Sequence, residues 1–153
     1  MKHYPPPIPR ERRRLPLRLP AFHPVPVSPR ADGWTPQRQV HFIGYLAETG
    51  SVQAACRRVS MGRESAYRLR KRPGAAGFAA AWDAALRKPH EAVNLASAKS
   101  TGLDAAYRHR CGLAVVIMHQ GRYVASRWKE DMNALLQWLG QLDRSQYNGG
   151  RGA

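Results

Sequence analysis

The feature that most restricts the possible fold of this chain lies in residues 50–72, where small, apolar and basic side chains follow a fixed spacing. Two short helices that cross steeply leave no room for a large side chain at their crossing. We expect the first helix over 52–58, after the capping residue Ser51, and the second over 63–71, before Pro73-Gly74 ends it. Small or apolar residues fill the positions that close the joint between them: Ala54, Ala55, Cys56, Val59, Met61, Ala66 and Leu69.

This spacing predicts a helix-turn-helix, whose second helix enters the major groove of duplex DNA. The residues left outside the joint on the second helix are candidates for base contacts: Arg63, Glu64, Tyr67, Arg68 and Lys71. The candidates for phosphate contacts are Ser51, Gln53, Arg57, Arg58, Arg70 and Arg72. Between residues 57 and 72 lie seven basic residues and one acid. A solvated helix surface usually mixes both signs, so the pattern favours DNA contact over simple solvation.

Several segments between residues 34 and 86 match a known type of protein. They are Trp34-Thr35-Pro36, Leu46-Ala47-Glu48-Thr49-Gly50-Ser51-Val52, Ser65-Ala66-Tyr67-Arg68-Leu69-Arg70, Pro73-Gly74-Ala75 and Phe78-Ala79-Ala80-Ala81-Trp82-Asp83. This block, about a third of the chain, resembles bacterial and phage helix-turn-helix proteins, including those like the small terminase subunit. The resemblance implies DNA binding, in transcription regulation or in recognising DNA for packaging.

Two positions in the turn depart from that family pattern. Ser60-Met61-Gly62 stands where such proteins often have Gly-Met-Ser. We therefore expect Ser60 at a positive φ, with some steric cost, because only glycine adopts that conformation freely. Gly62 replaces a serine cap, which costs a few tenths of a kcal/mol.

The N-terminal residues 1–33 hold nine of the twelve prolines and seven basic residues. Proline fixes φ and removes a backbone donor, so we expect a disordered or polyproline-like basic arm. The arm has two interpretations, a tail that follows the DNA minor groove and a solvated leader.

The remaining elements complete a mainly α fold. We expect a helix from Thr35-Pro36 to Gly50, and another from Ala75 that kinks or splits at Pro89 and continues to about residue 99. A hairpin should pair 113–118 with 122–126, followed by a helix over 127–143. The expected organisation is a disordered arm (1–33), a DNA-binding domain (34–100), a hairpin with a helix (101–147) and a flexible tail (148–153).

The last expected helix has an apolar stripe with two interpretations: it packs on the hairpin and the core, or it forms a dimer interface. Trp138 lies off the stripe and would be an exposed anchor for a partner. A homodimer or a protein partner would use Leu135, Leu139 and Trp138. The stripe comprises Trp128, Met132, Leu135, Leu136, Leu139 and Leu142.

Composition narrows the function classes. A formal net charge of +15 on 153 residues indicates a polyanionic partner. The sequence lacks nucleophile, phosphate-loop, paired-carboxylate and metal-ligand patterns, so we expect no enzyme, no cofactor and no metal. It has no segment typical of a membrane span or signal peptide, and we expect a cytoplasmic, nucleoid-associated protein. The rival hypothesis is an accessory protein that binds a protein partner through its last helix and is tethered non-specifically to nucleic acid.

Overall fold

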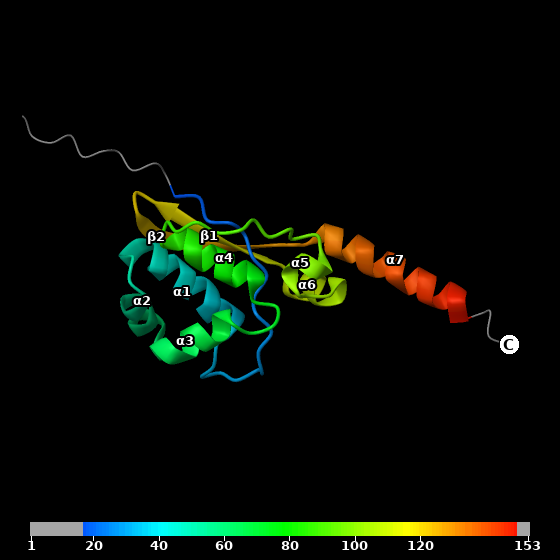
Figure 1. Cartoon of the computed structure of the whole chain (residues 1–153), viewed down its shortest axis with the longest axis horizontal. Helices are drawn as coiled ribbons and strands as arrows, with labels where there is room; N and C mark the ends of the chain where they lie inside the picture. Colours follow the sequence, from blue (N-terminus) through cyan, green and yellow to red (C-terminus); the bar gives the residue numbers. More distant parts are fainter. Residues whose placement is uncertain (1–16, 150–153) are drawn as a thin grey trace, which may run out of the picture.

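The computed structural model describes residues 17–149, which form seven helices and one two-stranded antiparallel hairpin. Helices α1–α4 and the hairpin gather in one body, α5 and α6 lie beside it, and α7 extends away from it (Figure 1). The expectation of a mainly α chain with a C-terminal hairpin and helix is confirmed. In chain order the elements are α1 (Pro36–Thr49), α2 (Val52–Val59), α3 (Arg63–Arg70), α4 (Ala76–Ala85), α5 (Ala98–Thr101), α6 (Ala105–Cys111), β1 (Leu113–His119), β2 (Arg122–Lys129) and α7 (Met132–Gly149).

Helix α1 is the centre of the body and has the expected ends. Thr35 Oγ1 accepts from the backbone N–H of Arg38 (3.2 Å), and Gly50 ends the helix at φ 67°. Phe42 on this helix is fully buried, with its ring centroid 4.9 Å from that of Trp82 on α4. Buried aromatic contacts of this kind stabilise the packing of α1 on α4.

The part of the expected disordered arm that the structure describes, residues 17–33, is instead packed into the core. Phe22 is fully buried and pairs with Ala114 of β1 through two backbone hydrogen bonds of 2.8 and 3.2 Å. The side-chain amide of Gln39 bonds the backbone N–H and carbonyl of Val25 (2.7 and 3.0 Å). The prolines prevent a helix here, but an extended chain still buries its alternate side chains and uses its remaining donors. The expected arm residues 1–16 lie outside the described part of the chain.

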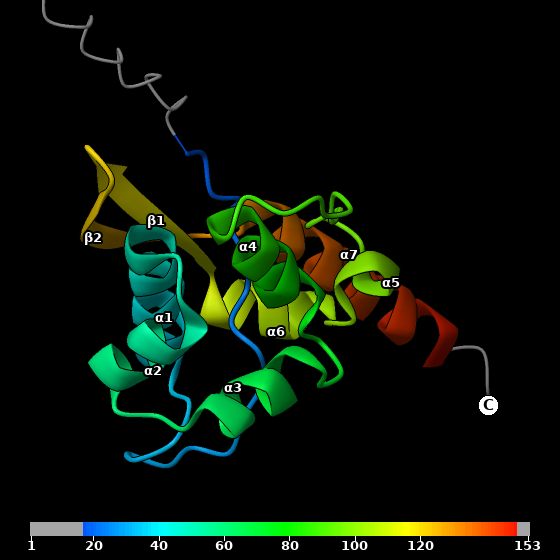
Figure 2. The same cartoon turned by 60° about the vertical axis from the view of Figure 1, so that its left-hand side comes forward.

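The hairpin packs on α1 on the side away from α2 and α3, as Figures 1 and 2 both show. Gln120 (φ 49°) and Gly121 (φ 78°) form its two-residue turn. Strand β2 is longer than expected and ends at Lys129, so the expected helix start at Arg127 is wrong. Cross-strand pairing extends β2, with Trp128 opposite Ala114, and α7 begins only after Asp131 accepts from the N–H of Ala134 (3.0 Å). The hairpin and α1 share one core, since Ala114 is buried within it.

The expected helix beyond Pro89 is also wrong. Helix α4 ends at Ala85, Arg87 adopts φ 57°, and the chain then runs without helix to α5. The left-handed conformation of Arg87 takes the chain out of the helix, and Pro89 disfavours a helical conformation of Lys88, so the helix does not resume there. Helix α6, which the sequence did not predict, follows a cap by Asp104.

Helix α7 corrects two expectations at the C-terminal end. Of the two interpretations of its apolar stripe, packing on the hairpin and the core does not hold for Leu136, which is 67% exposed, or for Met132, which is 52% exposed. Trp138, expected as an exposed anchor, is half-buried with its ring 6.1 Å from that of His109. Residues 148–149 belong to the helix and not to a flexible tail, and residues 150–153 lie outside the described chain. Among residues 17–149, no helix has the length and apolar character that crossing a membrane requires.

Candidate nucleic-acid interface

Helices α2 and α3 are joined by residues 60–62, and most of the residues expected at the joint between them are buried. Ala55 and Cys56 of α2 and Ala66 and Leu69 of α3 are buried in the same hydrophobic core. Ser51 caps α2 by accepting from the N–H of Ala54 (3.3 Å). The small side chains at the joint allow the two short helices to approach closely.

The two unusual turn residues adopt the conformations expected of them. Ser60 lies in the left-handed region, at φ 58° and ψ 40°. Gly62 begins α3 without a side-chain cap, and Ser65 Oγ donates to its carbonyl oxygen (2.7 Å). A second tether comes from Trp34, whose Nε1 donates to Ser65 Oγ (3.1 Å). The start of α3 is therefore held by the chain before α1 as well as by the turn.

The five candidate base-contact residues are all exposed. With Ala66 and Leu69 turned to the core, α3 presents one continuous polar face. Two contacts join side chains of this face, and a third joins Tyr67 to Trp82 of α4. The Arg63 guanidinium lies 5.6 Å from the centroid of the Tyr67 ring, the Tyr67 ring lies 5.1 Å from that of Trp82, and Arg68 Nη2 is 3.7 Å from Glu64 Oε2. Because the last pair is highly exposed, it constrains Arg68 only weakly.

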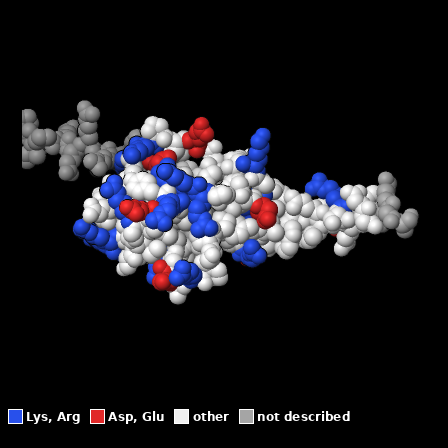
Figure 3. Space-filling model, turned by 60° about the horizontal axis from the view of Figure 1, so that its bottom comes forward, with Lys and Arg blue, Asp and Glu red and all other residues white. Residues whose placement is uncertain are grey.

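Five of the six candidate phosphate-contact residues are exposed as well: Ser51, Gln53, Arg57, Arg58 and Arg72. The Arg58 guanidinium lies 5.3 Å from the centroid of the Tyr45 ring, which directs its side chain along α1. Viewed from the side of α2 and α3, basic side chains gather over the helical body, whereas the α7 end is largely uncharged (Figure 3). The arrangement offers a polyanion one basic surface built around α3.

Arg70, the sixth candidate, is held by contacts within the protein. Its Nη1 and Nη2 donate to Oδ1 and Oδ2 of Asp83 (3.1 and 3.3 Å), and the guanidinium lies 4.9 Å from the centroid of Trp82. Both paired side chains are about three-quarters buried. A forked ion pair of this kind fixes Arg70 in place, so its main contact is the joint between α3 and α4.

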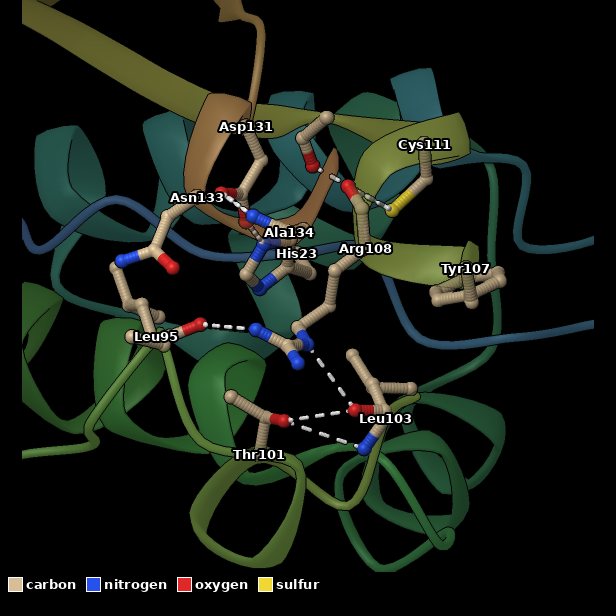
Figure 4. Close-up of polar contacts among 12 residues, drawn as sticks. His23, Leu95, Thr101, Leu103, Tyr107, Arg108, Cys111, Asp131, Asn133 and Ala134 are labelled. Carbon is tan, nitrogen blue, oxygen red and sulfur yellow. Dashed lines mark hydrogen bonds and ion pairs between the residues drawn. The ribbon is translucent and has the colours of Figure 1, made fainter. Parts of the chain in front are cut away.

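A buried polar cluster links the N-terminal segment to α6 and α7 (Figure 4). His23 Nε2 lies 2.7 Å from Asp131 Oδ2, and since a carboxylate only accepts, the imidazole donates from this nitrogen. Arg108 is fully buried and donates to the carbonyl oxygens of Leu103 and Leu95 (both 3.1 Å) and to Gln137 Oε1 (2.8 Å). Sequence reasoning missed this cluster, because its members are far apart in the chain and match no motif.

Burial shifts the pKa values of His23 in this cluster and of both cysteines. Burial lowers the pKa of His23, although the hydrogen bond that its imidazole donates to Asp131 opposes the shift. Burial also raises the pKa of the Cys111 thiol to about 11, and that of the Cys56 thiol in the same direction. Both cysteines are free thiols and are protonated at neutral pH, which makes them poor nucleophiles.

Metal-ligating side chains do not gather anywhere within residues 17–149: no three histidine, cysteine or acidic residues are placed to hold an ion together.

Comparison with protein-family models, with curated proteins and with solved structures found no match to this chain.

Proposed function

We propose that this chain binds double-stranded DNA, with α2, the turn and α3 acting as a helix-turn-helix. The observation that carries the proposal is the exposed face of α3. Arg63, Tyr67 and Arg68 lie on it, and Lys71 follows at the C-cap, while Ala66 and Leu69 fix the opposite face in the core. An α-helix with its side chains is about 10–12 Å across, which fits a major groove about 12 Å wide.

The roles of the residues follow from their positions on this surface. Arg63 and Arg68 suit the O6 and N7 acceptors of guanine, and Glu64 can accept from a cytosine amino group. Arg57, Arg58 and Arg72 suit phosphates, which orient the protein without reading sequence. The biological role follows from the resemblance of residues 34–86 stated above: a non-enzymatic regulator of transcription, or the component that recognises DNA in a phage-type packaging system, acting in the cytoplasm.

The test is selection of bound duplexes from a random pool, followed by titration of the selected duplex with variants. Arg63→Ala should weaken binding by roughly 1–3 kcal/mol and relax preference at one base pair. Arg144→Ala removes the same charge from an exposed position on α7 and is the matched control, expected to change neither quantity. The three phosphate arginines, at about −0.9 per contact, should give a log–log salt slope of about −2.7 or steeper. Failure to shift any duplex at about 100 mM salt and micromolar protein would overturn the proposal.

The rival function is an accessory protein that binds a partner through α7 and is tethered to nucleic acid by charge alone. The exposed apolar face of α7 favours it. The same titrations separate the two functions. If the chain is only tethered by charge, Arg63→Ala and Arg57→Ala each lower the affinity for every duplex sequence equally, and selection returns no preferred sequence.

A further inference from the structure

Helix α7 carries a row of large apolar side chains that nothing in residues 17–149 covers. Met132, Leu136, Leu139 and Leu142 are 52%, 67%, 47% and 45% exposed. Their spacing of three and four residues places them on one side of the helix. Four such side chains in a single row form a contiguous apolar surface, and surfaces of that kind mark contacts with another molecule.

The opposite side of α7 is the one that holds the helix in place. Ala134 is buried there, and Gln137 Nε2 donates to the carbonyl of Ala96 (2.7 Å) while its Oε1 accepts from Arg108. Trp138 packs beside His109 on α6. These residues lie about half a turn from Leu136 and Leu139, so the apolar row points away from the body. Helix α7 cannot bury the row against its own body without breaking these bonds.

Charge indicates which occupant fits this surface. The chain as a whole carries +15, but α7 has one acid, Asp143, and one base, Arg144, and Glu130 and Asp131 precede it. The α7 end is accordingly almost uncharged beside the basic body (Figure 3). Two copies of this chain repel each other over the basic body, whereas the α7 segments can approach without that cost. A nucleic acid would be drawn to the body instead.

We infer that α7 is a self-association surface, on which the same helix of a second copy packs in antiparallel orientation. With a two-fold axis near Leu139, Leu136 of one copy faces Leu142 of the partner subunit. This orientation keeps the two basic bodies at opposite ends of the helix pair. It also aligns the two helix dipoles antiparallel, which is the favourable arrangement for neighbouring helices. A standard interface buries about 800 Å² on each partner, and one helix face is smaller than that. We therefore expect a dimer with a dissociation constant in the micromolar range. This inference does not depend on DNA binding.

The experiment is sedimentation equilibrium of the nuclease-treated full chain from about 1 to 200 µM at high salt, without DNA. The wild type should pass from monomer to dimer. Leu136→Glu/Leu139→Glu should remain monomeric at every concentration, with an unchanged circular dichroism spectrum. The matched control, Gln141→Glu/Ser145→Glu, adds the same charge at exposed positions on the opposite side of α7 and should dimerise like the wild type.

Orientation is tested with cysteine variants under oxidising conditions. An equal mixture of Leu136→Cys and Leu142→Cys should give mainly the mixed disulfide, whereas parallel helices would give each variant paired with itself and overturn the antiparallel arrangement. A wild type that stays monomeric to 200 µM would overturn the inference. So would equal dimerisation of both double variants. Because DNA is absent, neither result affects the proposed function.

Discussion

The ion pair between Arg70 and Asp83 gives the sharpest prediction, because it separates two arginines that look equivalent in the sequence. Arg70 and Arg72 were both candidates for phosphate contacts. The structure commits Arg70 to Asp83 and Trp82, while Arg72 is exposed. We therefore expect Arg70→Ala to lower the stability of the fold and Arg72→Ala to lower the affinity for DNA.

The size of the stability loss follows from burial and geometry. Exposed ion pairs contribute about 0.2–1 kcal/mol, and breaking a fully buried pair costs about 3–5 kcal/mol. Arg70 and Asp83 side chains are 24% and 25% exposed, which places this forked pair between the two cases, at about 1–2 kcal/mol. Loss of the cation–π contact with Trp82 adds about 0.5–1 kcal/mol. Arg70→Ala should thus cost about 2 kcal/mol, or roughly 6 °C in Tm for a domain of this size.

The assay combines unfolding and binding. Urea unfolding of Arg70→Ala, Asp83→Ala and the double variant should give a coupling energy of about 1–2 kcal/mol. Arg72→Ala should change the unfolding free energy by less than about 0.5 kcal/mol. In DNA titrations over a salt series, Arg72→Ala should reduce the slope by about 0.9, and Arg70→Ala should leave it unchanged. If Arg70→Ala instead reduces the salt slope while its unfolding free energy stays at the wild-type value, the structural role assigned to Arg70 is refuted.

Three further predictions concern the fold. Burial lowers the pKa of His23 below its ordinary value of 6.5, so below about pH 6.5 the unfolded chain binds the proton more readily than the folded chain. Stability should therefore be complete above that pH and decline below it, and thermal melts of His23→Gln between pH 8 and 5 should show a shallower decline than the wild type. Gly44→Ala would place a Cβ against the Tyr123 ring, closer than real Cβ atoms come to a neighbour, and should cost about 1–3 kcal/mol in urea unfolding. Gly140→Ala meets no atom within 4 Å in the described chain and should stabilise α7 by about 0.5–1 kcal/mol; equal effects of the two would contradict the packing of β2 on α1. Ser60→Gly relieves the left-handed conformation at φ 58° but loosens the unfolded chain, for a net gain of about 0.5 kcal/mol, and a net loss would show that Ser60 is not strained.

Local signals accounted for the elements that the sequence predicted well. The ends of α1 and α2 depend on Thr35, Gly50, Ser51 and Ser60, and each acts on backbone groups within four residues. The hairpin was predicted for the same reason, because Gln120 and Gly121 form its turn through their own φ values. The exposed face of α3 follows from helical periodicity once Ala66 and Leu69 are assigned to the joint.

Contacts between distant segments decided the rest. Phe22 reaches Ala114 across most of the chain, and His23 reaches Asp131, so no window of sequence could show that the proline-rich segment is part of the core. The partner of Arg70 lies on another helix, which converts a candidate DNA contact into a structural one. The leucines of α7 show the limit of periodicity most directly. A repeating apolar pattern establishes that a helix has an apolar side, because each residue turns the chain by a fixed angle. Whether another segment packs against that side depends on where the fold places the rest of the chain, and the described chain leaves that side exposed.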